Sequence, residues 1–229
     1  VLSAACSGRL TEDWRQQRGI TGTINASELP GGWQRRPLKE TCEKFQYGSS
    51  AKSGKTGKVP VLRMGNLQNG EIDWNDLVYS SDAEEIKKYE LPPKTVLFNR
   101  TNSPELVGKT AIYRGERPAI FAGYLIRIQH GPESNPEYLN YCLNALEFKE
   151  YCSQVRTDGV SQSNINARKL AEYGIPWCPV EEQREIVRRV EALFKLADQV
   201  ERRVSAAAAR ADKLTQSILA KAFRGELVP

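Results

Sequence analysis

The chain has 229 residues, a formal net charge of +5 and a pI near 8.9. This length suits one globular domain together with an extended element. The mean hydropathy is −0.54, and no run approaches the ~18 apolar residues that a membrane span needs, so we expect no membrane partner. Because a mildly basic charge alone does not establish nucleic-acid binding, the distribution of charge along the chain matters more.

Cysteine and histidine usage gives no sign of a metal site or a cofactor. The cysteines are odd in number and show no C-x-x-C spacing, which predicts reduced, mostly buried thiols in a cytoplasmic protein. They are Cys6, Cys42, Cys142, Cys152 and Cys178. The single histidine, His130, precedes Gly131 and Pro132 in a predicted turn, so a loop histidine explains it better than catalysis does.

The first ten residues repeat a segment close to the end of the chain. "VLSAACSGRL" (1–10) aligns without a gap with "ILAKAFRGEL" (218–227), and Gly8 meets Gly225. An internal repeat of this kind indicates that the chain is built from equivalent structural units. It predicts that the chain opens with the end of one long helix and closes with the end of an equivalent one, as one copy of a tandem repeat whose upstream copy is missing.

The middle of the chain predicts a mixture of helices and strands. Short helices are expected at Thr11–Arg18 and at 37–42, with a linker between them. A capping box in which Ser81 faces Glu84 predicts a helix over 81–89. Asn69-Gly70 indicates a turn. Strands are predicted from β-branched and aromatic content over residues 59–67, 95–101, 109–114 and 119–129.

Two further helices are predicted after the strands. Asn135, with Pro136 at the first helical position, caps one helix, and Asn166 caps a short one that runs to Tyr173. The apolar residues of the first helix are expected to face the core; they are Leu139, Cys142, Leu143, Leu146 and Cys152. Together these elements predict an α+β domain that is followed by a coiled-coil arm.

Basic residues gather between Lys44 and Arg63, where five occur without an acidic one. The Gly- and Ser-rich part of this stretch, "QYGSSAKSGKTGK", predicts a flexible basic loop over 46–58 that suits phosphate contact. A solvated surface loop is the alternative. Within the loop, the expected phosphate contacts are Lys52, Lys55 and Lys58.

Residues beyond the loop are candidates for base or phosphate contacts, because Arg can fork onto guanine and Asn or Gln onto adenine. The candidates are Arg63, Asn66, Arg100, Asn102, Gln162 and Asn164. Each Asn also has a structural alternative: Asn66 could serve a turn, Asn102 a loop, and Asn164 a helix cap.

The last fifty residues predict one long helix, because neither Gly nor Pro occurs between Val180 and Arg224. It would be roughly 66 Å long at about 1.5 Å per residue and would stop at Gly225. Apolar residues recur in steps of four and three, a heptad seam that predicts a partner helix; a helix folded back on its own domain is the alternative. The seam comprises Ile186, Val190, Leu193, Ala197, Val200, Val204, Ala207, Ala211, Leu214 and Ile218.

Six stretches of the sequence carry a resemblance to a known family. They read "LPGGWQRRPL", "VPVLRMGNLQNGEID", "LFNRTNSPELVGKTAIY", "NPEYLNYCLN", "SNINARKLAEYGIPWCPVEEQREIV" and "LTQSILAKAFRGELV". Together and in this order they closely resemble the DNA-specificity subunit of type I restriction–modification enzymes, over essentially the whole chain. One departure is "IPWCP", where the family often has a Pro-Pro pair.

The resemblance implies two target-recognition domains that alternate with two long, antiparallel helices. This chain would be the second half: the end of the first helix and a linker (1–30), a target-recognition domain with a twisted β-sheet and flanking helices (31–178), and the second helix as a coiled-coil arm (179–229). It also implies a non-catalytic subunit that reads one half of a bipartite double-stranded DNA target. A methyltransferase (modification) subunit would carry S-adenosylmethionine, and a restriction subunit would cleave.

Three features of the sequence allow a rival interpretation. "NPEY" (135–138) resembles the N-P-P-Y motif of amino-methyltransferases, but Glu137 replaces the second Pro and a helix cap explains the rest. Glu85-Ile86-Lys87 after Asp73 or Asp76 could suggest a nuclease, although such triplets arise by chance. The long helix alone would also fit a coiled-coil adaptor without a DNA role. A salt-dependent shift with duplex DNA would separate an adaptor from a DNA-binding protein.

The long helix leads to two hypotheses about partners. Its charged face could dock the methyltransferase subunit, although a solvated flank would look the same. The charges considered are Glu181, Glu182, Arg184, Arg188, Arg189, Glu191, Arg202 and Arg203. The seam predicts a homodimer of the isolated chain, antiparallel by two-fold symmetry, which would prefer an inverted repeat with a fixed spacer.

Overall fold

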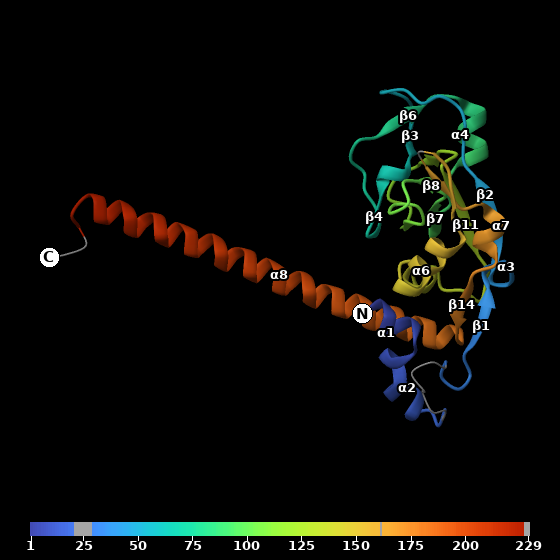
Figure 1. Cartoon of the computed structure of the whole chain (residues 1–229), viewed down its shortest axis with the longest axis horizontal. Helices are drawn as coiled ribbons and strands as arrows, with labels where there is room; N and C mark the ends of the chain where they lie inside the picture. Colours follow the sequence, from blue (N-terminus) through green and yellow to red (C-terminus); the bar gives the residue numbers. More distant parts are fainter. Residues whose placement is uncertain (21–28, 161, 227–229) are drawn as a thin grey trace. The chain divides into compact units, whose positions relative to one another are not determined.

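The computed structural model describes residues 1–20, 29–160 and 162–226. Contacts divide the chain into two compact units, Val1–Val187 and Arg188–Pro229. The boundary between them lies within the long helix α8 (Val180–Phe223). The first unit mixes strands and helices (Figure 1), which confirms the predicted α+β class. The finer division into 1–30, 31–178 and 179–229 stays a prediction.

A six-stranded sheet forms the centre of the first unit, in the order β2-β11-β7-β9-β5-β4. Neighbouring strands are antiparallel, except that β5 and β9 are parallel. The side chains of Leu97, Phe98 and Ile112 are fully buried, because the two middle strands are covered on both faces. The strands are β2 (Cys42–Tyr47), β4 (Leu67–Gln68), β5 (Gly70–Ile72), β7 (Thr95–Asn99), β9 (Thr110–Tyr113) and β11 (Leu125–His130).

Three smaller sheets surround the central one: β10-β3-β6, β12-β13-β8 and the pair β1-β14. The pair β1-β14 joins the two ends of the domain, since Gln34 lies opposite Trp177. Their strands are β1 (Gln34–Pro37), β3 (Val59–Leu62), β6 (Val78–Ser80), β8 (Thr101–Asn102), β10 (Ile120–Phe121), β12 (Thr157–Asp158), β13 (Ser163–Asn164) and β14 (Gly174–Trp177).

Short helices cover the central sheet. The helix α5 contacts β7 and β9, and its Asn135 cap accepts hydrogen bonds from the backbone of Glu137 and Tyr138, as predicted. The buried Tyr138 donates to Pro176 O at 2.7 Å. The helices are α1 (Leu2–Cys6), α2 (Glu12–Gln16), α3 (Leu38–Thr41), α4 (Ala83–Tyr89), α5 (Pro136–Cys142), α6 (Leu146–Val155) and α7 (Ala167–Ala171), with 3-10 turns η1 (Arg9–Thr11) and η2 (Met64–Asn66).

Three predicted strands are interrupted at positions that the residue content does not reveal. The strand expected over 59–67 ends at Leu62, because the Asn66 side chain accepts the Arg63 N–H and folds the chain into η2. The strand expected over 119–129 divides into β10 and β11, where Leu125 N–H donates to Ala122 O at 2.9 Å. The strand expected over 95–101 likewise divides at Arg100.

Two predicted helices also differ from those in the structure, one in its continuity and one in its cap. The helix that follows Asn135 breaks after Cys142 and resumes as α6, so Leu146 is 59% exposed and does not face the core. The cap of α4 is Asp82 rather than Ser81: the Asp82 carboxylate accepts hydrogen bonds from the N–H groups of Glu84 and Glu85.

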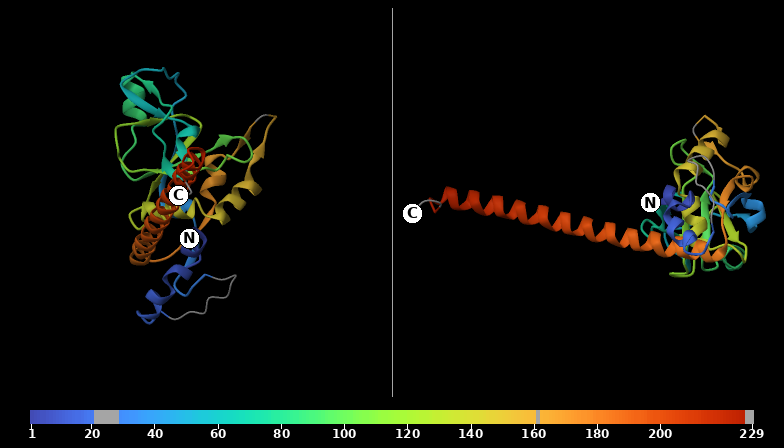
Figure 2. Two further views of the ribbon diagram at one scale, coloured as in Figure 1. Left: turned by 90° about the vertical axis from the view of Figure 1, so that its left-hand side faces the viewer. Right: turned by 90° about the horizontal axis from the view of Figure 1, so that it is seen from below.

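The long helix was predicted correctly in length and end. The helix α8 has 44 residues and runs without a break in both views of Figure 2. It stops at Gly225, whose φ of 72° is left-handed. The N–H groups of Gly225 and Glu226 donate to Ala222 O and Lys221 O at 3.0 and 2.9 Å, a common way to satisfy the last carbonyls of a helix. Leu227, the last residue of the repeat, and Pro229, the last residue of the predicted arm, lie outside the described residues.

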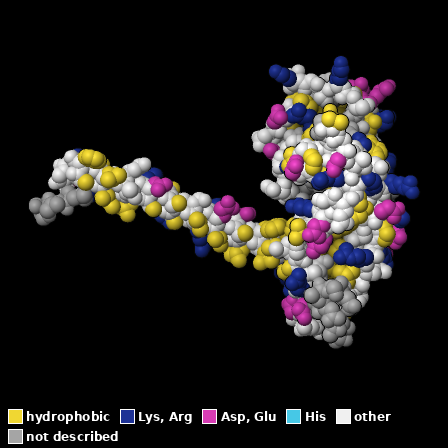
Figure 3. All heavy atoms as spheres, in the orientation of Figure 1, with side chains coloured by type: hydrophobic (Ala, Val, Ile, Leu, Met, Phe, Trp, Pro, Cys, Tyr) yellow, Lys and Arg dark blue, Asp and Glu magenta, His cyan; other side chains and the backbone are white. Residues whose placement is uncertain are grey.

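The heptad seam lies in two different environments along α8. Ile186 and Val190 are fully buried, so at these two positions the seam does not need a partner helix to cover it. From Leu193 onward the side chains are exposed, and hydrophobic side chains recur along the helix in Figure 3. None of the helices in the described part of the chain combines the length and the apolar composition that crossing a membrane requires.

Candidate nucleic-acid interface

Four of the nine predicted DNA-contact residues meet around one hollow on the domain. Lys52, Arg63, Arg100 and Asn164 line it, although they come from separate parts of the chain. We call this site, of about 710 Å³, the basic hollow. Its remaining lining is made by small, hydroxyl and apolar residues and by one aromatic residue, and none of the described lining residues is acidic. Lys52 and Arg100 favour an anionic ligand, whereas the charge of Arg63 is partly balanced by Asp76, which lies outside the lining.

The loop that carries Lys52 is fixed to the domain at both ends. At its start, Gly48 passes directly against the backbone of Ala122: a Cβ at Gly48 would lie 2.4 Å from Ala122 O. Farther along, Gly54 and Tyr79 exchange two backbone hydrogen bonds of 2.9 and 2.8 Å. The predicted flexible loop therefore has fixed anchors on either side of Lys52.

Arg63 and Asn66 have different roles, although the sequence predicts both as candidates for base or phosphate contacts. The Arg63 guanidinium bonds through Nη2 to Asp76, at 2.6 Å to the carbonyl and 3.0 Å to the carboxylate. Its buried Nε has no hydrogen-bond partner among the described residues. Asn66 is 3% exposed and uses its amide to bind the backbone at Arg63, Asp73 and Asn75. Asn66 thus holds a turn, and we exclude it from the proposed surface.

Arg100 contacts two other residues at the hollow, one aromatic and one polar. Its guanidinium carbon is 4.9 Å from the ring centroid of Tyr47, a cation–π distance. Its Nη2 donates to Asn164 Oδ1 at 3.4 Å, a long bond, and Asn164 Nδ2 donates to Thr101 Oγ1 at 2.7 Å. The buried Nε of Arg100 has no partner in the described part of the chain. The side chain therefore keeps donor capacity.

Two tyrosines at this site were missed from the sequence. Tyr124 lines the basic hollow and is 46% exposed, and Tyr47 is 42% exposed beside Arg100. Tyr124 lay inside a predicted continuous strand, which hid it. The signal that could have found it is Gly123, because a glycine inside a strand pattern often marks an interruption.

The other predicted contacts lie outside the basic hollow. Asn102 Oδ1 accepts the Ser103 N–H at 2.9 Å and serves a loop. The carbonyl of Gln162 accepts the Gly159 N–H at 2.8 Å. Lys55 and Lys58 are exposed on the same loop as Lys52 but do not line the hollow.

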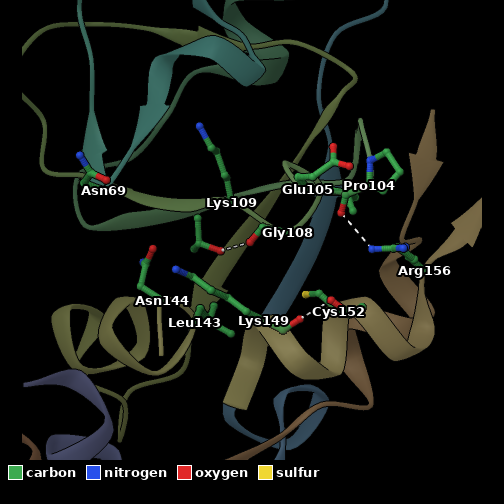
Figure 4. A pocket seen from close by; sticks show the side chains of 13 residues that line it. Asn69, Pro104, Glu105, Gly108, Lys109, Leu143, Asn144, Lys149, Cys152 and Arg156 are labelled. Atoms are coloured by element: carbon green, nitrogen blue, oxygen red, sulfur yellow. Dashed lines mark hydrogen bonds between the residues drawn. The ribbon is translucent and has the colours of Figure 1, made fainter. Parts of the chain in front are cut away.

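A second hollow, the polar hollow, lies against helix α6 (Figure 4). It has a volume of about 470 Å³. Two of its cations are held by neighbours: Lys109 Nζ donates to Gln68 Oε1 at 3.0 Å, and Arg156 Nη1 donates to Pro104 O at 3.0 Å. Glu105 also lines it. Its mixed charge makes it a weaker candidate for phosphate than the basic hollow.

The residues behind the rival enzyme interpretations have structural roles. Asn135 caps a helix and Tyr138 is buried, so "NPEY" is explained without catalysis. The Glu85 carboxylate accepts a hydrogen bond from Ser49. Across residues 1–20, 29–160 and 162–226, no three His, Cys, Asp or Glu side chains gather as a metal site would require.

Comparisons with known proteins identify the family of the chain. The family described as "Type I restriction modification DNA specificity domain" matches residues 30–208. The chain belongs to this family. It is 32% identical over 235 residues to the type I restriction enzyme EcoKI specificity subunit of Escherichia coli (strain K12), which covers 99% of this chain and 48% of that subunit. The chain therefore spans about half the length of this curated relative.

Solved structures of type I specificity subunits have the same fold. A chain from a study of complex assembly and conformational transition of the type I R-M system superposes with a TM-score of 0.69 at 20% identity, covering 99% of this chain and 54% of that one. The HsdS subunit from Thermoanaerobacter tengcongensis gives a TM-score of 0.62 at 21% identity, with the same coverage. The sequence-based resemblance and the fold class are confirmed.

Proposed function

We propose that this chain binds double-stranded DNA through the basic hollow and reads one half of a bipartite target, as half of a type I specificity subunit. The observation that carries the proposal is the meeting of Lys52, Arg63 and Arg100 around one hollow that has no acidic residue in its described lining. Family membership supplies the ligand class, because the matching family is one of DNA specificity domains.

The chemistry of the hollow suits both parts of DNA recognition. Phosphates supply most of the affinity and base edges supply the sequence information. Lys52 lies on the anchored loop as a phosphate contact. Arg100 and Asn164 are the candidates for base edges, since a guanidinium pairs with guanine and an amide with adenine.

Salt dependence of DNA binding tests the proposal. Substituting alanine for Lys52, Lys55 and Lys58 together should weaken binding to all duplexes and lower the slope of log affinity against log salt by about 1 for each lost phosphate contact. Fluorescence anisotropy across a salt series measures both quantities. An unchanged affinity and slope would remove the loop from the interface. A wild-type chain with no salt-dependent binding would instead favour the adaptor alternative.

A finer part of the proposal concerns partner subunits. We infer that the charged face of α8 docks the methyltransferase subunit and that the assembly recruits a restriction subunit. The support is the dense alternation of acidic and basic residues beside the seam. Glu182 is excluded from this face, because it is 1% exposed and pairs with Arg15. Charge reversal at Arg188 and Arg202 should reduce co-purification with a modification subunit. If neither charge reversal changes co-purification, docking would be assigned to the globular domain.

The exposed seam supports pairing of two copies of the chain. Leu193 to Ile218 is the exposed part, and burying one Leu, Ile or Val contributes about 1.5–3 kcal/mol. An antiparallel pairing is compatible with two-fold symmetry, and copies paired in this way would prefer an inverted repeat with a fixed spacer. Light scattering should show a dimer at micromolar concentration. A monomer at tens of micromolar would contradict this part.

A further inference from the structure

A third hollow on the domain, of about 660 Å³, carries an excess of positive charge. Its cations are Lys44, Lys87, Lys88 and Arg127, and Glu90 is the single acidic residue in its described lining. We call this site the lysine hollow. None of its lining residues also lines the basic hollow, so its charges are additional to those already proposed to contact DNA.

Arg127 reaches the lysine hollow from within the sheet. It lies opposite Gln46 where β11 pairs with β2 (Figure 1), and it is 9% exposed. Within the described chain its guanidinium makes one hydrogen bond, from Nη1 to Glu90 O at 3.3 Å, and its enclosed Nε makes none. The terminal nitrogen Nη2 remains for a ligand in the hollow. Burial lowers the pKa of Arg127, because removal from water disfavours the charged form.

Another buried arginine shows what Arg127 lacks. Arg15 is 4% exposed, and its Nη1 lies 2.5 Å from Glu182 Oε1 while its Nη2 donates to Gly8 O at 2.7 Å. A buried charge normally has such an anionic partner. No carboxylate among the described residues forms an ion pair with Arg127. An anion bound in the lysine hollow would give Arg127 the partner that Glu182 gives Arg15.

Three lysines bring further positive charge to the same hollow. Lys44 lies two residues before Gln46 on β2, so both side chains are on the face that Arg127 occupies. Lys87 and Lys88 lie in the last turn of α4, and all three lysines are exposed. Like charges that share a hollow repel one another, and a bound anion relieves the repulsion. A phosphate group fits this charge, because it accepts hydrogen bonds from guanidinium and ammonium groups at the same time.

The lysine hollow and the basic hollow are associated with opposite faces of strand β2. Gln46 and Tyr47 are consecutive residues of β2, so their side chains point to opposite faces. Gln46 lines the lysine hollow, whereas the ring of Tyr47 lies against Arg100, which lines the basic hollow. A phosphate in the lysine hollow is therefore not one of those that Lys52 and Arg100 would contact.

We propose that the lysine hollow is a second anion site that binds a phosphate group, through Arg127 from within the sheet and through Lys44 and Lys87 from its rim. The group has two sources: a free phosphate, and the phosphate backbone of DNA that extends beyond the basic hollow. Binding of a free phosphate does not depend on the function proposed above, whereas the DNA source rests on it.

Nitrogen NMR of the full chain tests the site, with inorganic phosphate as the probe. The Nε–H signal of Arg127 is identified as the one that Arg127→Lys removes. Phosphate that replaces chloride at constant ionic strength should shift this signal to saturation and leave the Nε–H signal of Arg15 in place. Lys44→Ala together with Lys87→Ala should raise the dissociation constant about tenfold, since two charge-assisted contacts are lost. The matched control, Lys149→Ala in the polar hollow, should leave it unchanged.

A DNA duplex in place of phosphate separates the two sources. If DNA supplies the group, the duplex shifts the Arg127 signal, and the double lysine variant lowers the salt slope of duplex binding by about 2. If a free phosphate supplies it, the duplex changes neither. An Arg127 signal that moves with neither probe, or that moves equally in the double lysine variant, would overturn the proposal. A wild-type chain that binds phosphate but no duplex would contradict the basic hollow and leave the lysine hollow standing.

Discussion

The two ends of helix α8 carry the same heptad pattern, but their side chains lie in different surroundings. At the start, Glu182, Gln183 and Ile186 are at most 1% exposed, whereas Val204 and Leu214 are 63% and 62% exposed. A periodic pattern specifies a face of a helix. It does not specify what covers that face, which depends on the residues that the rest of the chain brings to it.

Polar residues distinguish the buried start from the exposed remainder. Glu182 accepts hydrogen bonds from Thr11, Arg15 and Trp33 at 2.7, 2.5 and 2.9 Å. Gln183 donates to Cys178 O at 2.8 Å and accepts the Asn135 N–H, also at 2.8 Å. A buried polar group is tolerated when its hydrogen bonds are made. The start of α8 is therefore built into the domain by specific contacts and not by apolar burial alone.

Removing the Glu182 carboxylate should have the largest effect on stability. Glu182→Ala leaves Arg15 buried without its partner, which costs about 3–5 kcal/mol. The control is Glu172→Ala, since the Lys39–Glu172 pair is about half exposed and such pairs contribute about 0–1 kcal/mol. Chemical denaturation of the folded chain measures both. Equal effects of the two substitutions would mean that the start of α8 is not anchored as described.

Alanine substitutions at the two ends of the seam should affect different properties: the stability of the domain at one end and self-association at the other. Ile186→Ala removes a fully buried side chain, so the free energy of unfolding should fall by about 2–5 kcal/mol. Leu214→Ala changes an exposed position, so unfolding should change by less than about 0.5 kcal/mol while self-association weakens. Denaturation and light scattering provide the two readouts. A reversed pattern would show that the exposed half is the one that stabilises the domain.

Ionisation of the buried cysteines should have the smallest effect on the free energy of unfolding, and only at high pH. All five are free and buried; burial raises the pKa of Cys152 from 9.0 to about 12 and that of Cys42 to about 11. The unfolded thiols lose their protons first, so the free energy of unfolding should decline as the pH rises above about 8.5. Mass spectrometry after thiol labelling at pH 8 should find no modified cysteine in the folded chain and five after unfolding.

The sequence predicted the elements whose pattern is local. The long helix, the Gly225 stop and the Asn135 cap depend on residues close together in the chain, and all are found. It failed where a side-chain hydrogen bond decides. Asn66 folds a turn by reaching Asp73 and Asn75, and this hydrogen bonding, invisible to a count of apolar residues, interrupts a predicted strand.

The candidate site shows the same limit. Residue type pointed to Lys52, Arg63, Arg100 and Asn164, which the fold brings to one hollow. Tyr124 joins them because the chain turns between β10 and β11. Such a meeting depends on sheet topology, which joins segments far apart in the sequence and which no single motif contains.

The most direct test of the basic hollow is the affinity of Arg100→Ala for DNA. Duplexes bound by the wild-type chain are first selected from a random pool, and affinities are then measured by anisotropy at fixed salt. The account predicts a loss of about 1–3 kcal/mol for Arg100→Ala and no loss for Lys149→Ala in the polar hollow. An unchanged affinity in Arg100→Ala, or an equal loss in Lys149→Ala, would contradict the basic hollow as the DNA-reading surface.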